Sequence, residues 1–197
     1  MREYTEQEQI RREKLTEISK VCNPYPDRFE KTHSLKDAKK LEDGISNVSV
    51  AGRIVFMRKM GKLSFVRIRD LEGDLQLEFK IDEVGEEGYA LLKKQIDTGD
   101  FIGATGEMFT TQTGEKTLRV KTFKFLGKAL RPLPEKFHGL SDTELKYRER
   151  YVDLISNEES REVFLGRSKF YAFVHKFLGE HGFLQVETPI MQTAVCG

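Results

Sequence analysis

Tryptophan is absent from the 197 residues, and only two cysteines, Cys22 and Cys196, are present. Neither cysteine belongs to a CxxC pair or lies beside paired histidines, which argues against zinc sites and against a disulfide framework. The four histidines show neither metal-ligand nor catalytic-triad spacing. We therefore predict that no residue holds a metal, and the low cysteine content suits a reducing cytoplasm.

Long hydrophobic runs and common catalytic motifs are also missing. The N-terminal sequence MREYTEQEQIRREKL lacks the apolar core of a signal sequence, and no stretch approaches the length of a membrane span. Neither a GxxxxGK[ST] phosphate loop nor a GxSxG nucleophile motif occurs. We predict a protein without a membrane segment, and we assign no catalytic residue in this sequence.

Neither sign of charge is in excess. Thirty-three Lys and Arg residues accompany thirty-two Asp and Glu residues, so the formal net charge is +1. Any nucleic-acid surface must therefore be a local patch, because no global positive field attracts phosphates. The composition is 38% hydrophobic and 33% charged, which is typical of a soluble globular chain, and the length suits one domain and part of a second.

Alternating apolar and polar residues predict a barrel of short strands. Five strands and one short helix follow one another in the order strand, strand, strand, helix, strand, strand, which is the order of a five-stranded OB-fold. The strands are predicted at 46–58, 63–70, 74–81, 100–111 and 116–127, with the helix at 85–96 and a bulge or bend at Gly52. The predicted fold class is mainly β with flanking helices, in which the barrel follows an N-terminal helix and precedes a helical region.

The second strand, LSFVRIRD, carries an aromatic ring on its basic face. Period-2 geometry directs Val66 and Ile68 to one face and Phe65, Arg67 and Arg69 to the other. An OB-fold binds oligonucleotides on the face formed by its second and third strands, where aromatic rings stack on bases. Phe65 is therefore a candidate stacking residue, although a single exposed aromatic side chain needs no function.

Three further side chains are candidates for the same face. Gln76, on the third strand, can both donate and accept hydrogen bonds, as the reading of a base edge requires. Glu115 lies in the loop TQTGEK between the last two strands and could accept from a base. Arg58 lies near the first turn and could hold phosphate. The alternative for Glu115 is an ordinary turn residue, and for Gln76 and Arg58 it is the more common one, a solvated surface side chain.

The N-terminal residues predict a helix over 7–20. Thr5 and Glu8 form a capping-box pattern, and a weak apolar stripe follows. Its other face is almost wholly charged, so we predict a solvated arm; the alternative is a tRNA-contacting helix that uses Arg11, Arg12 and Lys14.

Composition divides the chain into four parts. They are an N-terminal helix and lead-in at 1–45, the OB-fold at 46–128, a proline-containing linker at 129–142, and a second domain at 143–197. The second domain combines a long helix at 157–182, rich in phenylalanine, with a predicted strand at 183–188. These elements are too few to enclose a core, so we expect this domain to be incomplete and its aromatic stripe to be covered by a missing domain or a second subunit.

The second half of the chain carries the most specific motifs. RPLPEKFHGLSDTELKYRERYVDLISNEESREVFLGRSK closely resembles the linker and first helices of lysyl-tRNA synthetases, and GFLQVETPIMQ resembles class II motif 1. AGRIVFMRKMGKLSFV and GEKTLRV resemble the barrel of the same family. The pattern KFHGLxDxExxYRxRYxDLI distinguishes this family from the aspartyl and asparaginyl enzymes. The resemblance implies an N-terminal OB-fold anticodon-binding domain and the start of a class II α+β catalytic domain.

The resemblance also implies roles for individual residues. Phe65 matches the aromatic residue that stacks on the anticodon, Gln76 matches a glutamine that hydrogen-bonds an anticodon base, and Glu115 matches a glutamate that recognises a uridine. Arg58 matches a basic contact to the anticodon stem-loop, and Arg67 shares their face. The implied ligand of this face is the uridine-rich anticodon of lysine tRNA.

The remaining implications concern the parent enzyme. Motif 1 builds a dimer interface in the family, which implies interface roles for Phe183, Val186 and Pro189 and a homodimer; Gly197 begins a lysine-binding loop. The parent would be a lysine–tRNA ligase that uses ATP, Mg²⁺ and lysine. Motifs 2 and 3, which bind these substrates, are absent from this sequence, so we expect the chain to hold no cofactor and not to aminoacylate alone. The rival interpretation is a stand-alone module that binds tRNA or other single strands.

Overall fold

The computed structural model describes residues 3–134, 140 and 142–191. The chain divides into two compact units, Met1–Leu133 and Pro134–Gly197, and each is described by itself. The first unit contains all five strands and the second contains only helices and extended chain among the described residues. The four-part division predicted from composition is finer than this and stays a prediction.

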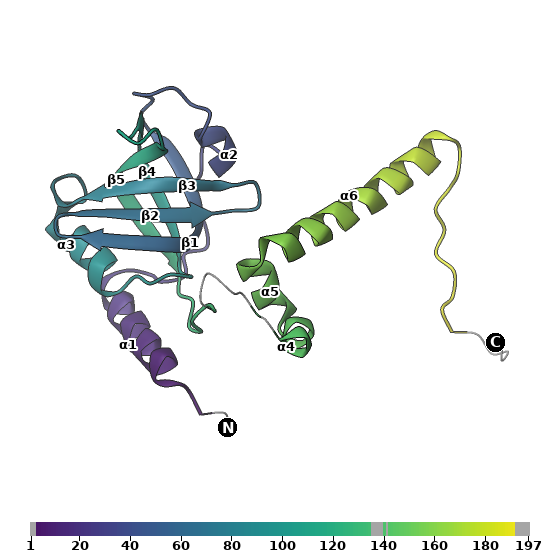
Figure 1. Cartoon of the computed structure of the whole chain (residues 1–197), viewed down its shortest axis with the longest axis horizontal. Helices are drawn as coiled ribbons and strands as arrows, with labels where there is room; N and C mark the ends of the chain where they lie inside the picture. The colour runs from purple at the N-terminus through teal and green to yellow at the C-terminus, as the bar shows by residue number, and fades with distance from the viewer. Residues whose placement is uncertain (1–2, 135–139, 141, 192–197) are drawn as a thin grey trace. The chain divides into compact units, whose positions relative to one another are not determined.

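Five strands in the first unit form a closed barrel, as Figure 1 shows. They are β1 (Val48–Met60), β2 (Leu63–Arg69), β3 (Asp74–Lys80), β4 (Phe101–Thr110) and β5 (Lys116–Gly127). Their order around the barrel is β1-β2-β3-β5-β4, and only β3 and β5 run parallel. Helix α3 (Ile81–Lys94) connects β3 to β4. The strand order and the connecting helix confirm the predicted OB-fold.

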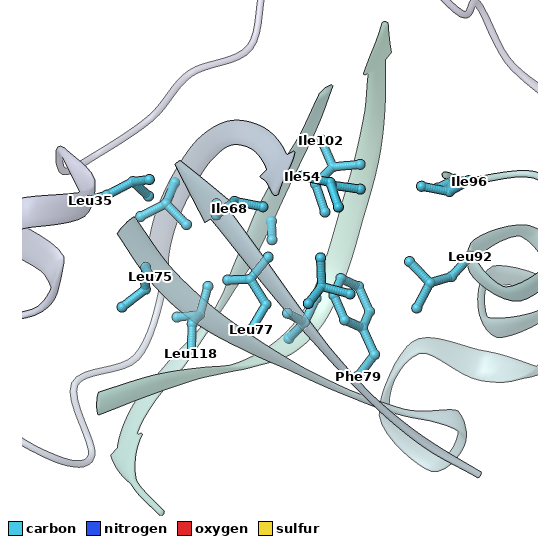
Figure 2. Packing of buried hydrophobic residues seen from close by; sticks show 14 of the residues in the cluster. Leu35, Ile54, Ile68, Leu75, Leu77, Phe79, Leu92, Ile96, Ile102 and Leu118 are labelled. Carbon is cyan, nitrogen blue, oxygen red and sulfur yellow. The ribbon is translucent and has the colours of Figure 1, made fainter. Parts of the chain in front are cut away.

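Strict alternation on β2 and β3 builds the barrel core. Ser64, Val66 and Ile68 are fully buried, whereas the residues between them are only half-buried. Figure 2 shows how the inward chains of β2 and β3 meet those of the other strands and of α3. The predicted parity of β2 is therefore confirmed. The residues labelled there are Leu35, Ile54, Ile68, Leu75, Leu77, Phe79, Leu92, Ile96, Ile102 and Leu118.

Register shifts interrupt the strand pairing at three points, one between β1 and β2 and two between β4 and β5. On β1 the pairing with β2 slips between Ile54 and Phe56, so the bulge predicted at Gly52 lies instead at this point. A Cβ on Gly52 would lie 2.8 Å from the carbonyl oxygen of Arg69, so this glycine permits a close backbone approach. A second shift lies on β5 between Val120 and Thr122, and the third lies near the other end of the same strand pair, between Phe101 and Ile102 of β4.

Helix α1 (Glu6–Val21) begins at Thr5 with the predicted capping box, which confirms this helix. It is not a solvated arm, because Ile18 is fully buried in the barrel core. Arg11 donates from Nη1 to the carbonyl oxygen of Ala129 at 2.7 Å, and the Lys14 ammonium lies 2.6 Å from Asp97. The basic face of this helix thus binds the barrel, and contact with tRNA stays a prediction.

A buried ion cluster secures the same region. The Lys128 ammonium is fully buried and lies 2.6 Å from Asp97 Oδ2 and 2.8 Å from Asp100 Oδ2. It also donates to the carbonyl oxygen of Gln95. Burial raises the pKa of the Asp100 carboxyl. Burial also acts to raise the pKa of Asp97, but hydrogen bonds from Lys128 and Lys14 outweigh it, so that pKa lies below its ordinary value.

The lead-in to the barrel contains one short helix, α2 (Leu35–Ala38). Ser34 caps it by accepting from the Asp37 backbone N–H. Leu35 and Ala38 are fully buried in the core, so this segment is a structural part of the barrel unit. Lys39, the C-cap residue of α2, lies with its ammonium 3.4 Å from Asp74 of β3.

The second unit consists of α4 (Thr143–Arg148), α5 (Arg150–Ser156) and α6 (Glu158–Glu180). The aromatic stripe of α6 is exposed, as illustrated by Phe170 at 62% and Phe173 at 63%. The strand predicted at 183–188 is wrong: the chain there is extended but unpaired. A strand needs a partner for its backbone groups, and the described part of this unit contains no other strand.

Candidate nucleic-acid interface

The outward side chains of β2 and β3 form one surface, which we call the β2–β3 face: Phe65 and Arg67 from β2 with Gln76 and Glu78 from β3. Phe65 pairs across the strands with Glu78, and Arg67 pairs with Gln76. On the other side of β2, Arg58 of β1 pairs with Phe65. Cross-strand partners have Cβ atoms about 4.5–5.5 Å apart, so these side chains are neighbours.

Arg67 connects this face to the loop between β4 and β5. Its guanidinium donates to Asp74 at 3.0 Å and to Glu115 Oε1 at 3.2 Å. Lys39 reaches the same carboxylates, at 3.4 Å from Asp74 and 3.7 Å from Glu115. The Arg67 guanidinium and the Lys39 ammonium therefore hold the Glu115 carboxylate beside the strand face.

The electrostatics of this cluster favour the charged form of Asp74. Burial acts to raise the pKa of Asp74, but the charges of Lys39 and Arg67 outweigh it, so the pKa lies below its ordinary value. The ionised Asp74 carboxylate accepts from Arg67 Nη1 at 3.0 Å and so orients the guanidinium. The cluster can thus present Glu115 as a hydrogen-bond acceptor near Arg67 without leaving a net negative patch.

Gln76 is oriented by the neighbouring strand β5. Its amide nitrogen donates to Thr117 Oγ1 at 3.1 Å, and that hydroxyl donates to the backbone carbonyl of Glu115 at 3.1 Å. Residues 76 and 117 are register partners in the parallel β3–β5 pair. The Gln76 side chain is therefore held by Thr117 at the start of β5, two residues after Glu115.

Glu78 has a different role from that expected of an outward residue. Its side chain lies on the outward side of β3, opposite Phe65, yet it is only 6% exposed. Arg119 Nε donates to Glu78 at 3.1 Å while its guanidinium lies over the Phe109 ring at 4.3 Å, and Lys80 lies 3.3 Å from the same carboxylate. Glu78 is therefore a structural ion-pair residue that borders Phe65.

The structure brings together Phe65, Arg67, Gln76, Glu115 and Arg58 on one side of the barrel. Sequence reasoning missed Lys39 and Asp74. Lys39 lies beside Glu115, and Asp74 accepts from Arg67. The acidic residues at the end of the β2–β3 turn could have indicated Asp74. Lys39 belongs to the lead-in, and no sequence periodicity predicts the path of that segment.

The remaining candidate residues belong to the second unit. Phe183 and Val186 are 67% and 69% exposed in extended chain, and Pro189 is exposed as well. Gly197 lies outside the described residues. No geometry among the described residues tests their roles, which stay predictions.

The Arg58 assignment yields a prediction about salt. Arg58 is exposed at the edge of the β2–β3 face, so Arg58→Ala is expected to remove one phosphate contact. The slope of log K against log salt for a single-stranded anticodon loop should become shallower by about 0.7. Titrations at several salt concentrations measure this slope, and Lys121→Ala, an exposed lysine on β5, is the control. An unchanged slope for Arg58→Ala would exclude its phosphate role.

The described residues also limit other kinds of site. Within 3–134, 140 and 142–191, no group of three or more histidine, cysteine, aspartate or glutamate side chains could hold a metal ion. No helix in this part of the chain combines the length and apolar character that crossing a membrane requires.

Comparison with known families agrees with the two units. Residues 48–126 match the family model described as OB-fold nucleic acid binding domain. Residues 142–197 match the model described as tRNA synthetases class II (D, K and N). The first match covers β1 to β5, and therefore the whole β2–β3 face.

Individual relatives extend the match to nearly the whole chain. Proteins named lysine–tRNA ligase from Carboxydothermus hydrogenoformans and Thermoanaerobacter pseudethanolicus are 46% and 47% identical, each over 99% of this chain and 40% of the relative. The ligase of Lysinibacillus sphaericus is 43% identical over 99% of this chain and 41% of its own length. The chain thus spans about two-fifths of the length of these relatives. The chain therefore combines an OB-fold nucleic acid binding domain with a class II tRNA synthetase segment, and over nearly its whole length it is similar to proteins named lysine–tRNA ligase.

Proposed function

We propose that the β2–β3 face binds the anticodon of lysine tRNA as the recognition part of a lysine–tRNA ligase. The observation that carries this proposal is the convergence of an aromatic ring, a fixed amide and a fixed carboxylate on one OB-fold face, with Glu115 held by Arg67 at 3.2 Å. The names of the relatives supply the amino acid and the reaction class.

Each side chain has a distinct task in this proposal. Phe65 stacks on one base and contributes affinity that does not depend on base identity. Gln76 presents an amide to a base edge, and Glu115 accepts from an imino or amino group, which favours bases that donate there. Arg58 and Arg67 offset the charge of the backbone phosphates. Stacking therefore supplies binding, and the amide and the carboxylate supply selectivity.

The rest of the reaction is proposed for the longer protein. A lysine–tRNA ligase joins lysine to its tRNA at the expense of ATP, with Mg²⁺ on the phosphates. The described residues do not fit a magnesium site, so we assign none of them to the ion. We also propose a homodimer that uses Phe183, Val186 and Pro189, a lysine-binding loop at Gly197, and a cytoplasmic location.

A titration with anticodon variants tests the proposal. The chain is titrated with the lysine anticodon stem-loop and with the same stem-loop carrying a changed middle base, at fixed salt. We expect clear preference for the native anticodon, because Gln76 and Glu115 discriminate between base edges. Equal affinity would favour the rival function, a module that binds single strands without reading their sequence, and no binding to either stem-loop would overturn both.

Phe65→Ala separates stacking from folding. Phe65 is half-buried on the outside of the barrel, so its removal leaves the core intact. The variant is expected to bind the stem-loop more weakly by about 1–3 kcal/mol, the contribution of one stacked base. Thermal unfolding measured beside the titration distinguishes the two effects: a large loss of stability would place Phe65 in the core instead.

A further inference from the structure

The bulge in β1 turns a second aromatic ring onto the binding side of the barrel. Ile54 is fully buried, and after the slip in pairing Met57 packs against the core while Phe56 and Arg58 are exposed. Without the bulge, Phe56 would follow Ile54 with period 2 and point inward. Instead, 44% of the Phe56 side chain is exposed to solvent.

Phe56 and Phe65 form a regular pattern with two arginines. Phe56 pairs across the strands with Arg67, and Arg58 pairs with Phe65. Each ring thus has an arginine directly opposite, and the two rings occupy diagonal positions whose Cα atoms lie about 7–8 Å apart. Each aromatic–arginine pair combines a stacking surface for a base with a cation for a phosphate.

We propose that Phe56 is a second base-stacking residue, so that the barrel holds two successive bases of a single-stranded loop, one on Phe65 and one on Phe56. This inference rests on the proposed function and extends the same site onto β1. The ligand class is a single-stranded RNA segment with at least two unstacked bases.

The chemistry of the site favours a base over other apolar partners. Arg58 and Arg67 alternate with the rings, and this arrangement matches a chain that alternates flat bases with phosphates. Two stacked bases would also fix the position of the loop along the strands, because the two rings occupy diagonal sites on β1 and β2. Phe56 would therefore contribute to register as well as to affinity.

The absence of tryptophan makes a direct test possible. Phe56→Trp introduces a single indole on the proposed stacking position, and its fluorescence is followed as the lysine anticodon stem-loop is added. We expect strong quenching at saturation with affinity retained. Tyr25→Trp is the matched control, since Tyr25 is 52% exposed and lies beside Gly127, at the opposite end of β5 from the residues that pair with β3.

Abasic stem-loops identify the base involved. Each contains one abasic nucleotide in the loop, and the position that removes quenching of the Phe56→Trp indole is the base stacked on residue 56. We expect this position to be adjacent to the one that Phe65 stacks on, identified as the abasic position at which Phe65→Ala no longer lowers affinity. Quenching that survives every abasic substitution would overturn the proposal.

Phe56→Leu tests the energy of the contact without a fluorophore. Leucine keeps apolar bulk but lacks a flat ring, so affinity is expected to fall about 5- to 150-fold, the range for one stacked base. Phe56→Tyr should restore affinity, whereas Tyr25→Leu should leave it unchanged. Wild-type affinity in Phe56→Leu together with reduced affinity in Phe65→Ala would overturn the Phe56 proposal alone. Loss of anticodon preference in the wild-type chain would instead contradict the proposed function.

Discussion

Lys128→Met is expected to lower the free energy of unfolding of the barrel by about 3–5 kcal/mol, the cost of breaking a buried ion pair by removing one partner. Lys128 and Asp100 are both fully buried, 2.8 Å apart, and Asp97 lies 2.6 Å from the same ammonium. Methionine fills the space but leaves the Asp100 carboxylate without a countercharge. Amide hydrogen exchange of β1 to β5 in denaturant measures the stability of this unit without interference from α4 to α6.

The cost of Lys128→Met should shrink as the pH falls. Burial raises the folded-state pKa of Asp100 above its unfolded value, so an unpaired Asp100 destabilises the fold above that pKa and is relieved as the carboxyl is protonated. In the wild type the lowered pKa of Asp97 has the opposite effect on the pH dependence. It stabilises the fold above the unfolded-state pKa, and this stabilisation is lost as the pH falls through the folded-state pKa. The difference in stability should therefore be larger at about pH 7 than at about pH 5.

Lys121→Met provides the control for charge and side-chain length. Lys121 is half exposed and lies 3.9 Å from Glu107, and exposed pairs of this kind contribute about 0–1 kcal/mol. An equal effect of both substitutions, or a pH-independent cost for Lys128→Met, would show that the buried charge is not what stabilises this region.

Gly106→Ala should disrupt the barrel where β4 contacts β5. A Cβ at this position would lie 1.9 Å from the carbonyl oxygen of Arg119 and 3.1 Å from Val120 Cα, both backbone atoms that cannot rotate away. The strands must separate at the slip between Val120 and Thr122. We expect a loss of at least the about 1–3 kcal/mol typical of overpacked interiors, because backbone rather than side chains must move.

Gly73→Ala is the matched control for Gly106→Ala. Its Cβ would lie 3.8 Å from Lys36, an ordinary contact distance, so the barrel should keep its stability within about 0.5 kcal/mol. Amide exchange of β4 and β5 separates the two outcomes. If β4 and β5 stayed fully protected from amide exchange in Gly106→Ala, the close approach of Gly106 to the Arg119 carbonyl would be contradicted.

The sequence predicted the parts of the barrel that depend on local alternation. On β2 a period of two placed Val66 and Ile68 inside and Phe65 and Arg67 outside, and a single register satisfies all four. On β1 the same rule fails after Ile54, because a bulge depends on how β1 pairs with β2 and not on its own residues. Phe56 was missed for this reason.

Contacts between distant segments were also beyond local reasoning. Helix α1 was expected to be solvated because its charges resemble a surface face, yet Arg11 and Lys14 satisfy partners near residues 97 and 129. On β3 the alternation directs Glu78 outward, but its burial depends on Arg119 of β5, which is 41 residues away in the sequence. For 183–188, alternation indicated a strand, but pairing requires a second strand that the described part of that unit does not provide.

The β2–β3 face is complete only after β5 has been synthesised and has paired with β3. Gln76 and Thr117 are 41 residues apart, and their contact orients an amide that the proposed recognition needs. A nascent chain that has produced only β1 to β3 contains Phe56, Phe65 and both arginines, but it lacks Glu115 and the strand that fixes Gln76. Such non-local pairing forms late, since loop closure must precede it. The two aromatic rings are therefore synthesised before the strand that orients Gln76, and the proposed recognition surface is complete only when β5 has paired with β3.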